Sequence, residues 1–199
     1  MDRTVLDRES ALALLHEQMQ NQNLRRHCYA VGKVLADFYD YFLEKDLLET
    51  SLSKDQWEVA GILHDADWEK TKDCPSRHTL ELLSWLENYE VAPELLNLFN
   101  SHNSKITGLR RPETLLEWTL ECSDELTGFI VAVALVMPSK KLTDVTVESV
   151  LKKFKQKEFA KQVEREQILL CEEKLGIDTE EFVKIVLNSM KNNSDLLGL

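Results

Sequence analysis

Hydrophobic positions recur at helical spacing along most of the chain. The clearest case begins at Asn23, after which one face of a long helix carries Leu24, Val31, Val34, Leu35, Phe38 and Phe42. No segment alternates steadily between apolar and polar residues, as a half-buried strand would. The apolar run FIVAVALV (129–136) is continuous with Leu115, Leu116 and Leu120, and this length favours a helix over a buried strand. The pattern therefore predicts an all-α protein.

Capping residues and prolines indicate where the helices begin and end. Ser53-Lys-Asp-Gln56 and Asp178-Thr-Glu-Glu181 are typical capping boxes, and Pro93 and Pro112 suit the first turn of a helix. Helices are expected to begin near residues 12, 23, 53, 76, 93 and 112, and three more to span 147–160, 163–175 and 178–190. We expect polar loops at 67–75 and 104–111, and a frayed tail at 191–199.

Composition narrows the class of protein and its partners. A chain of 199 residues with 43% hydrophobic and 30% charged residues can form one well-packed domain over residues 1–199. Its net charge of −11 argues against binding to a nucleic-acid polymer or to an anionic membrane, since both require a basic face. The four cysteines are widely spaced, and the charged N-terminus lacks the apolar core of a signal peptide. We therefore expect reduced thiols and a cytoplasmic location.

Four of the five histidines fall on the apolar faces of different helices. His27 precedes Val31, Val34 and Phe38 at helical steps, and His64 closes the helix that contains Trp57 and Ala60. His78 shares a face with Leu82, Trp85 and Leu86, and His102 follows Leu95, Leu98 and Phe99. One such histidine is more often a hydrogen-bonded core residue than a metal ligand. Four of them on four helices favour a shared site.

Asp124 supports this interpretation, because it is aligned with Leu116, Leu120 and Val131 on a face that must be buried. An unpaired buried carboxylate costs several kcal/mol unless it is protonated, paired or bound to a metal. Few basic residues occupy apolar faces, so a metal ion is the simplest partner. Imidazole and carboxylate ligands suit Fe, Mn, Zn, Co or Ni better than Mg or Ca. One or two divalent ions are expected.

The spacing of the polar residues excludes several familiar sites. The chain has no H-E-x-x-H zinc motif, no Glu-x-x-His pair of a di-iron bundle and no phosphate-binding glycine loop. It also lacks the G-x-S-x-G elbow of serine hydrolases. Instead, the candidate ligands come singly from separate helices, with one adjacent doublet, His64-Asp65.

The order His27, His64-Asp65, Asp124 resembles the H…HD…D signature of the HD-domain superfamily of metal-dependent phosphohydrolases. His78 and His102 fall where the family's binuclear branch has two further histidines, which gives H…HD…H…H…D. RRHCYAVGKVLADF and WEVAGILHDADWEKT are similar to the family's two ligand helices. ECSDELTGFIVAVALVMPSKKL and VESVLKKFKQKEFA resemble a group of small prokaryotic HD proteins. The resemblance covers roughly residues 10–190.

The resemblance implies a helical bundle whose HD core spans about 10–137, with accessory helices at about 146–190. It assigns one metal to His27, His64, Asp65 and Asp124, and a second metal, bridged by Asp65, to His78 and His102. His64 and Asp65 are then the residues closest to the chemistry, which is hydrolysis of a phosphate ester by metal-activated water. The substrate would be a nucleotide or another small phosphorylated metabolite.

The residues after the doublet limit this inference. Enzymes of the HD-GYP branch, which cleave cyclic dinucleotides, have H-D-x-G-K, whereas Asp67 and Trp68 occupy the glycine and lysine positions here. We therefore do not expect a cyclic dinucleotide to be the substrate. Candidate phosphate-binding cations are Lys70, Arg77, Lys105 and Arg110, with Lys72 and Arg111 nearby and Arg26 beside the first ligand. Asp67 and Glu69 are expected to orient ligand imidazoles, to accept from a substrate hydroxyl, or to be ordinary polar loop residues.

Two other functions fit the same ligand set. Di-iron oxygenases with the HD fold, such as the inositol oxygenases, have a similar H…HD…H…H…D set. A non-catalytic module that binds a metal or nucleotide and signals through a partner is the third reading. The helices after residue 146 are expected either to cover the site or to form a homodimer.

Overall fold

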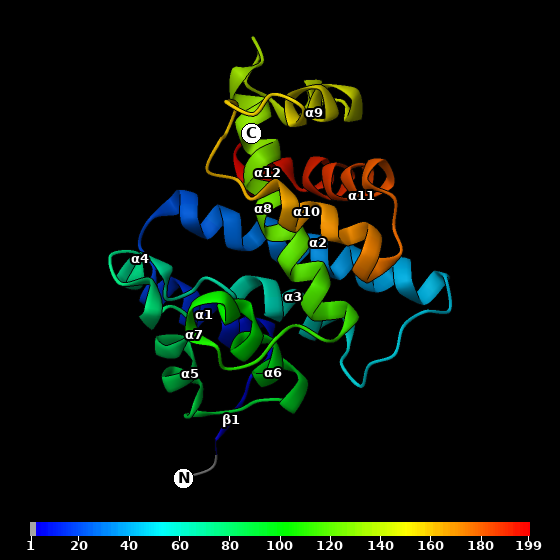
Figure 1. Ribbon diagram of the computed structural model, residues 1–199. Helices are drawn as coiled ribbons and strands as arrows, with labels where there is room; N and C mark the ends of the chain where they lie inside the picture. Colours follow the sequence, from blue (N-terminus) through cyan, green and yellow to red (C-terminus); the bar gives the residue numbers. More distant parts are fainter. Residues whose placement is uncertain (1–2) are drawn as a thin grey trace.

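A computed structural model describes residues 3–199 and confirms the all-α prediction (Figure 1). The longer helices are α1 (Arg8–Gln18), α2 (Gln22–Glu44), α3 (Lys54–Leu63), α5 (Leu80–Leu86), α6 (Pro93–His102), α8 (Leu115–Val136), α9 (Val147–Phe154), α10 (Arg165–Leu170) and α11 (Thr179–Asn192). Shorter turns of helix are α4 (Trp68–Thr71), η1 (Pro75–Arg77), α7 (Ser104–Thr107), η2 (Leu142–Asp144), η3 (Cys171–Leu175) and α12 (Ser194–Leu197).

Helices α2 and α3 form the centre of the fold because two glycines let their backbones meet. A methyl group added to Gly61 would lie 2.5 Å from the backbone nitrogen of Gly32, closer than any side chain permits. The Ser53–Gln56 capping box that starts α3 is present, as predicted. Helix α8 packs against α2, so the three helices that carry His27, His64 and Asp124 meet in the middle of the molecule (Figure 1).

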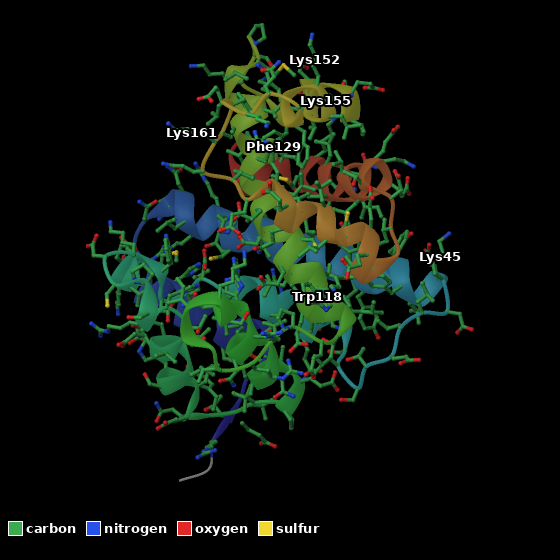
Figure 2. All side chains as sticks on the ribbon, in the orientation of Figure 1. Lys45, Trp118, Phe129, Lys152, Lys155 and Lys161 are labelled. Carbon is green, nitrogen blue, oxygen red and sulfur yellow. The ribbon has the colours of Figure 1, made fainter. Side chains whose placement is uncertain are left out.

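Aromatic side chains join the C-terminal helices to this centre. Phe182 of α11 stacks on Phe38 of α2 with ring centroids 5.0 Å apart, and Trp57 of α3 lies 6.1 Å from Phe42. Further along α8, Phe129 contacts Phe154 and Phe159 at 5.6 and 5.5 Å. Figure 2 labels Phe129 below the end of the molecule that carries the exposed Lys152 and Lys155.

A two-residue parallel sheet ties the start of the described chain to the segment after α5. Strand β1 (Thr4–Val5) pairs with β2 (Tyr89–Glu90), and Leu6 then donates a backbone hydrogen bond to Glu90. No alternating pattern predicted these strands, since two residues are too few to produce one.

Several predicted boundaries were wrong. The segment 67–75, expected to be a polar loop, contains α4 and begins with a fully buried Asp67, and 104–111 contains α7. Helix α8 starts at Leu115, since Thr114 and Glu117 form a capping box after Pro112. Asp178 caps α11 but does not form the predicted capping box with Glu181.

The C-terminal helices also differ from the sequence prediction. Helix α9 ends at Phe154 instead of 160, and α10 starts at Arg165 instead of 163. The tail expected to fray forms α12, which packs on α2 and has a buried Leu197. Among residues 3–199, the structure has no helix whose length and hydrophobicity would let it cross a membrane.

Candidate metal centre

His27 enters the site from the second turn of α2. Its Nε2 atom lies 2.8 Å from Asp124 Oδ1 on α8, so the two helices meet at this pair. Its Nδ1 atom lies 3.3 Å from the hydroxyl of Thr127, which itself donates to the carbonyl of Asp124. That hydroxyl can therefore accept from Nδ1, which leaves Nε2 as the nitrogen that faces Asp124 and that a metal could bind in place of its proton.

The His64-Asp65 doublet stands where α3 ends. The Nδ1 atom of His64 donates to the carbonyl of Gly61 at 2.7 Å, which fixes the orientation of a fully buried ring. Its Nε2 atom then lies 3.2 Å from His27 Nε2 and 3.4 Å from Asp124 Oδ1. Two ring nitrogens and a carboxylate oxygen thus face one small space.

Asp65 lies between this group of atoms and a second group formed by His78 and His102. Its Oδ2 atom lies 3.7 Å from the Nε2 atoms of both His27 and His64. Its Oδ1 atom lies 3.2 Å from His78 Nε2 and 3.5 Å from His102 Nε2. Each oxygen of one carboxylate therefore faces a different pair of imidazoles, the arrangement that a carboxylate bridging two metal ions requires.

Two further carboxylates hold the second pair of histidines. Asp67 Oδ1 accepts from His78 Nδ1 at 2.7 Å, and Asp67 Oδ2 accepts from the backbone N–H of Leu82 at 3.0 Å. Glu121 Oε1 lies 2.9 Å from His102 Nδ1. Carboxylates in this position orient ligand imidazoles and make them better electron donors.

The cluster has strongly perturbed acid–base properties. Burial raises the pKa of Asp65, but His64 and the hydrogen-bonding His102 and His78 outweigh burial, so its pKa lies well below the ordinary value. Burial lowers the pKa of His102, but Asp65 and Glu121 raise it well above 6.5. The same balance raises the pKa of His27 and His78, with Asp124 and Asp65 as the respective main partners. Carboxylates and imidazoles thus stabilise each other's charged forms.

The donor atoms fall into two groups that could each hold a metal ion: His27, His64, Asp65 and Asp124 in one, and Asp65, His78 and His102 in the other. Every one of the four imidazoles uses Nδ1 for a protein acceptor and turns Nε2 toward the group. This shared orientation fits metal binding, because a ring held by a protein oxygen at Nδ1 can give Nε2 to a metal once that nitrogen is unprotonated. The residues present therefore fit one or two metal ions.

A cavity of about 620 Å³ opens over both groups. The cavity is lined by Asp65, Asp124, His27, His78 and His102, and also by Trp68, Glu125 and, from the C-terminal part, Val163, Glu164 and Gln167. The edge of the Trp68 ring contacts His78 with centroids 5.1 Å apart. The C-terminal segment thus forms part of the wall of the site, which agrees with one of its two expected roles.

The candidate phosphate-binding cations are distributed differently from the ligands. Lys105 lines the cavity, where it pairs with Glu164 and Gln167 across the opening. Lys70 donates to Gln18 and lies over the Trp85 ring, and Arg77 pairs with Glu81. Arg110 pairs with Glu113 and the buried Glu117. The structure places only Lys105 of these four at the cavity, within the part of the chain it describes.

Sequence reasoning missed Glu121 and Thr127 and left Asp67 undecided. Glu121 is a buried acid on α8, three residues before Asp124, so the rule that singled out Asp124 applies to it equally. Thr127 carries no such signal, because a hydroxyl that bonds its own helix is common. Glu69 instead accepts backbone hydrogen bonds from Gln20 and Asn21, and does not touch the ligands.

Comparison with known proteins gives no relative: no protein-family model, curated protein or solved structure matches the chain.

Proposed function

We propose that the chain is a metal-dependent phosphohydrolase of the HD-domain type, acting on a nucleotide or another small phosphorylated metabolite. The observation that carries the proposal is Asp65, whose two oxygens face two separate pairs of imidazole nitrogens. A pair of metals bridged by one carboxylate is an arrangement suited to phosphoryl transfer. The order of the ligands along the chain, H…HD…H…H…D, supports the same family.

His27, His64, Asp65 and Asp124 would hold one ion, and Asp65, His78 and His102 the other. Bound there, divalent metals supply Lewis-acid charge for a phosphoryl group and lower the pKa of water to near neutrality. Mn, Fe, Zn, Co and Ni suit these ligands, and Mg suits them less well.

Other residues of the chain orient the imidazole rings of the proposed ligands. Asp67 and Glu121 keep the His78 and His102 rings turned with Nε2 inward, and the Gly61 carbonyl does so for His64. Lys105 is the candidate cation in the cavity wall for a substrate phosphate, once it exchanges its Glu164 partner. Trp68 and Ile106 give that cavity apolar walls.

The test combines metal analysis with a substrate screen. Protein purified without added metal is analysed for elemental content and then assayed for phosphate release from nucleotides and phosphomonoesters. Asp65→Ala should lose both metal and phosphate release. Asp40→Asn, a carboxylate variant at an exposed Lys54 ion pair, serves as the control and should keep both.

Each alternative has a distinct outcome in this test. Substrate-dependent consumption of dioxygen without phosphate release would replace the hydrolase proposal by the di-iron oxygenase. Metal binding with neither reaction would favour a binding module. A wild-type protein that takes up no metal would refute the site itself.

A further inference from the structure

A second cavity adjoins the metal centre on the other side of His27. It has a volume of about 440 Å³ and lies between α2, α8 and the C-terminal residues of the described chain. It shares His27 and Gly128 with the first cavity. Most of the remaining wall is apolar, formed by Ala30, Val131, Leu135, Leu197 and Leu199. The two cavities therefore meet beside a proposed metal ligand.

Gly128 keeps the junction open. It lies four residues after Asp124, one helical turn further along α8, and it is exposed between the buried Thr127 and Phe129. A methyl group added there would meet no atom within 4 Å. Any larger side chain would extend into the space that the two cavities share.

The apolar wall of the second cavity is accessible to a ligand. Leu135 is 51% exposed, and Val131 is half-buried one turn earlier on the same helix. Covering such surface with an apolar ligand group gains about 25 cal/mol for each Å² removed from water. A cavity of this size is typical of small-molecule sites.

Arg26 adds a cation to this apolar cavity. It directly precedes His27, and its guanidinium lies against Gly198. Within residues 3–199 its side chain forms no ion pair or hydrogen bond, whereas Lys105, Arg77 and Arg110 are all paired with acids. An unpaired guanidinium in a chain of net charge −11 is suited to an anionic group of a ligand.

We propose that the second cavity binds the non-phosphorylated part of the substrate. The substrate class is then a phosphate ester whose apolar portion passes over Gly128 and ends in an anionic group at Arg26. This inference rests on the proposed function, since it places the phosphate at the metal centre. The proposed substrate has an apolar portion and an anionic end, and different ligands can test each of these two parts.

Alkylphosphonates test the apolar part without requiring turnover, because their C–P bond is not hydrolysed like an ester. Methyl-, butyl- and hexylphosphonate are titrated into the metal-loaded protein by calorimetry. Affinity should rise with chain length, by up to about fourfold for each methylene that is fully buried. Gly128→Val should lose this rise while keeping its metal content. Val136→Ala, an exposed neighbour outside both cavities, should retain the rise.

A second pair of ligands tests Arg26. 6-Phosphonohexanoate should bind several-fold tighter than hexylphosphonate, and Arg26→Met should remove that preference. Equal affinity along the alkyl series, or a rise that Gly128→Val leaves intact, would overturn the second cavity as a substrate site while leaving the metal centre in place. A carboxylate preference that survives in Arg26→Met would overturn the role of Arg26. Failure of every phosphonate to bind would overturn both proposals.

Discussion

Replacing Gly61 by alanine should separate the two central helices. The added Cβ would lie 2.5 Å from the nitrogen of Gly32, 2.6 Å from its Cα and 2.7 Å from the carbonyl carbon of Val31. All three are backbone atoms of α2, so no side chain can rotate to make room. Helices α2 and α3 would have to move apart along the contact that brings His27 and His64 together.

The magnitude follows from these distances. Carbon atoms pack at about 3.5–4.0 Å, so the helices must part by about 1 Å. Overpacking of this kind costs typically about 1–3 kcal/mol, and a contact between backbones belongs at the upper end. Alanine regains up to about 1 kcal/mol through its better helix propensity. We expect a net loss of about 2 kcal/mol in the free energy of unfolding.

The same change should reach the metal centre. The Gly61 carbonyl accepts from His64 Nδ1 at 2.7 Å, so a displaced carbonyl reorients a ligand ring. Loss of such an orienting hydrogen bond typically lowers metal affinity about 10- to 100-fold. Gly61→Ala should therefore weaken metal binding as well as folding.

Urea unfolding and metal titration of three glycine variants test this reasoning. Gly32→Ala, whose nearest contact is the Glu58 carbonyl at 3.0 Å, should lose less stability than Gly61→Ala. Gly128→Ala meets nothing within 4 Å and should gain about 0.5–1 kcal/mol, as an unhindered helical alanine does. Wild-type stability in Gly61→Ala, or a greater loss in Gly128→Ala, would refute the close-packing argument.

Three further predictions follow from the site and the core. Asp67→Asn should weaken metal binding about 10- to 100-fold with little change in the fold, because the His78 ring loses its charged acceptor. Calorimetric metal titration measures this change, and an affinity equal to that of the wild type would contradict the prediction. The metal-free protein should lose stability as pH rises above 6.5, because His102 then loses the proton that its raised pKa retains in the folded state. The metal-loaded protein should show no such loss. A urea midpoint of the metal-free protein that increases over this range would contradict the prediction. Iodoacetamide should label Cys74 alone in the native protein and all four thiols in urea, since burial raises the pKa of Cys28, Cys122 and Cys171.

The long helices could be predicted because their stability depends on a repeated pattern. Helix α2 presents Val31, Leu35, Phe38 and Phe42 along one buried face, and this spacing is visible in the sequence. Short elements lack enough residues to repeat a pattern. The single turns α4 and α7 and the β1–β2 pair depend on contacts with distant segments, such as the Asp67 carboxylate that accepts from Leu82.

The C-terminal tail also could not be predicted from its local sequence. Residues 191–199 are polar apart from three leucines, so by local composition they should fray. Leu197 nevertheless becomes buried because α12 packs against α2, a contact that the sequence of the tail does not encode by itself. A terminal segment is ordered by the surface it meets, and α2, which forms that surface here, ends 150 positions before α12 begins.

The candidate metal ligands and the candidate phosphate-binding cations differ in predictability for a physical reason. A histidine or aspartate on an apolar face needs a partner, because burial makes an unsatisfied polar group costly. Such positions are few, and the structure brings all six together. Lysine and arginine carry no such constraint, since long flexible stems let them pair with any nearby acid at the surface. Arg77 and Arg110 do this within their own segments, so proximity in sequence to the ligands was a weak guide. Gly128, and the place of Arg26 in the second cavity, could not be predicted, because an open space is a property of the packing and not of any one residue.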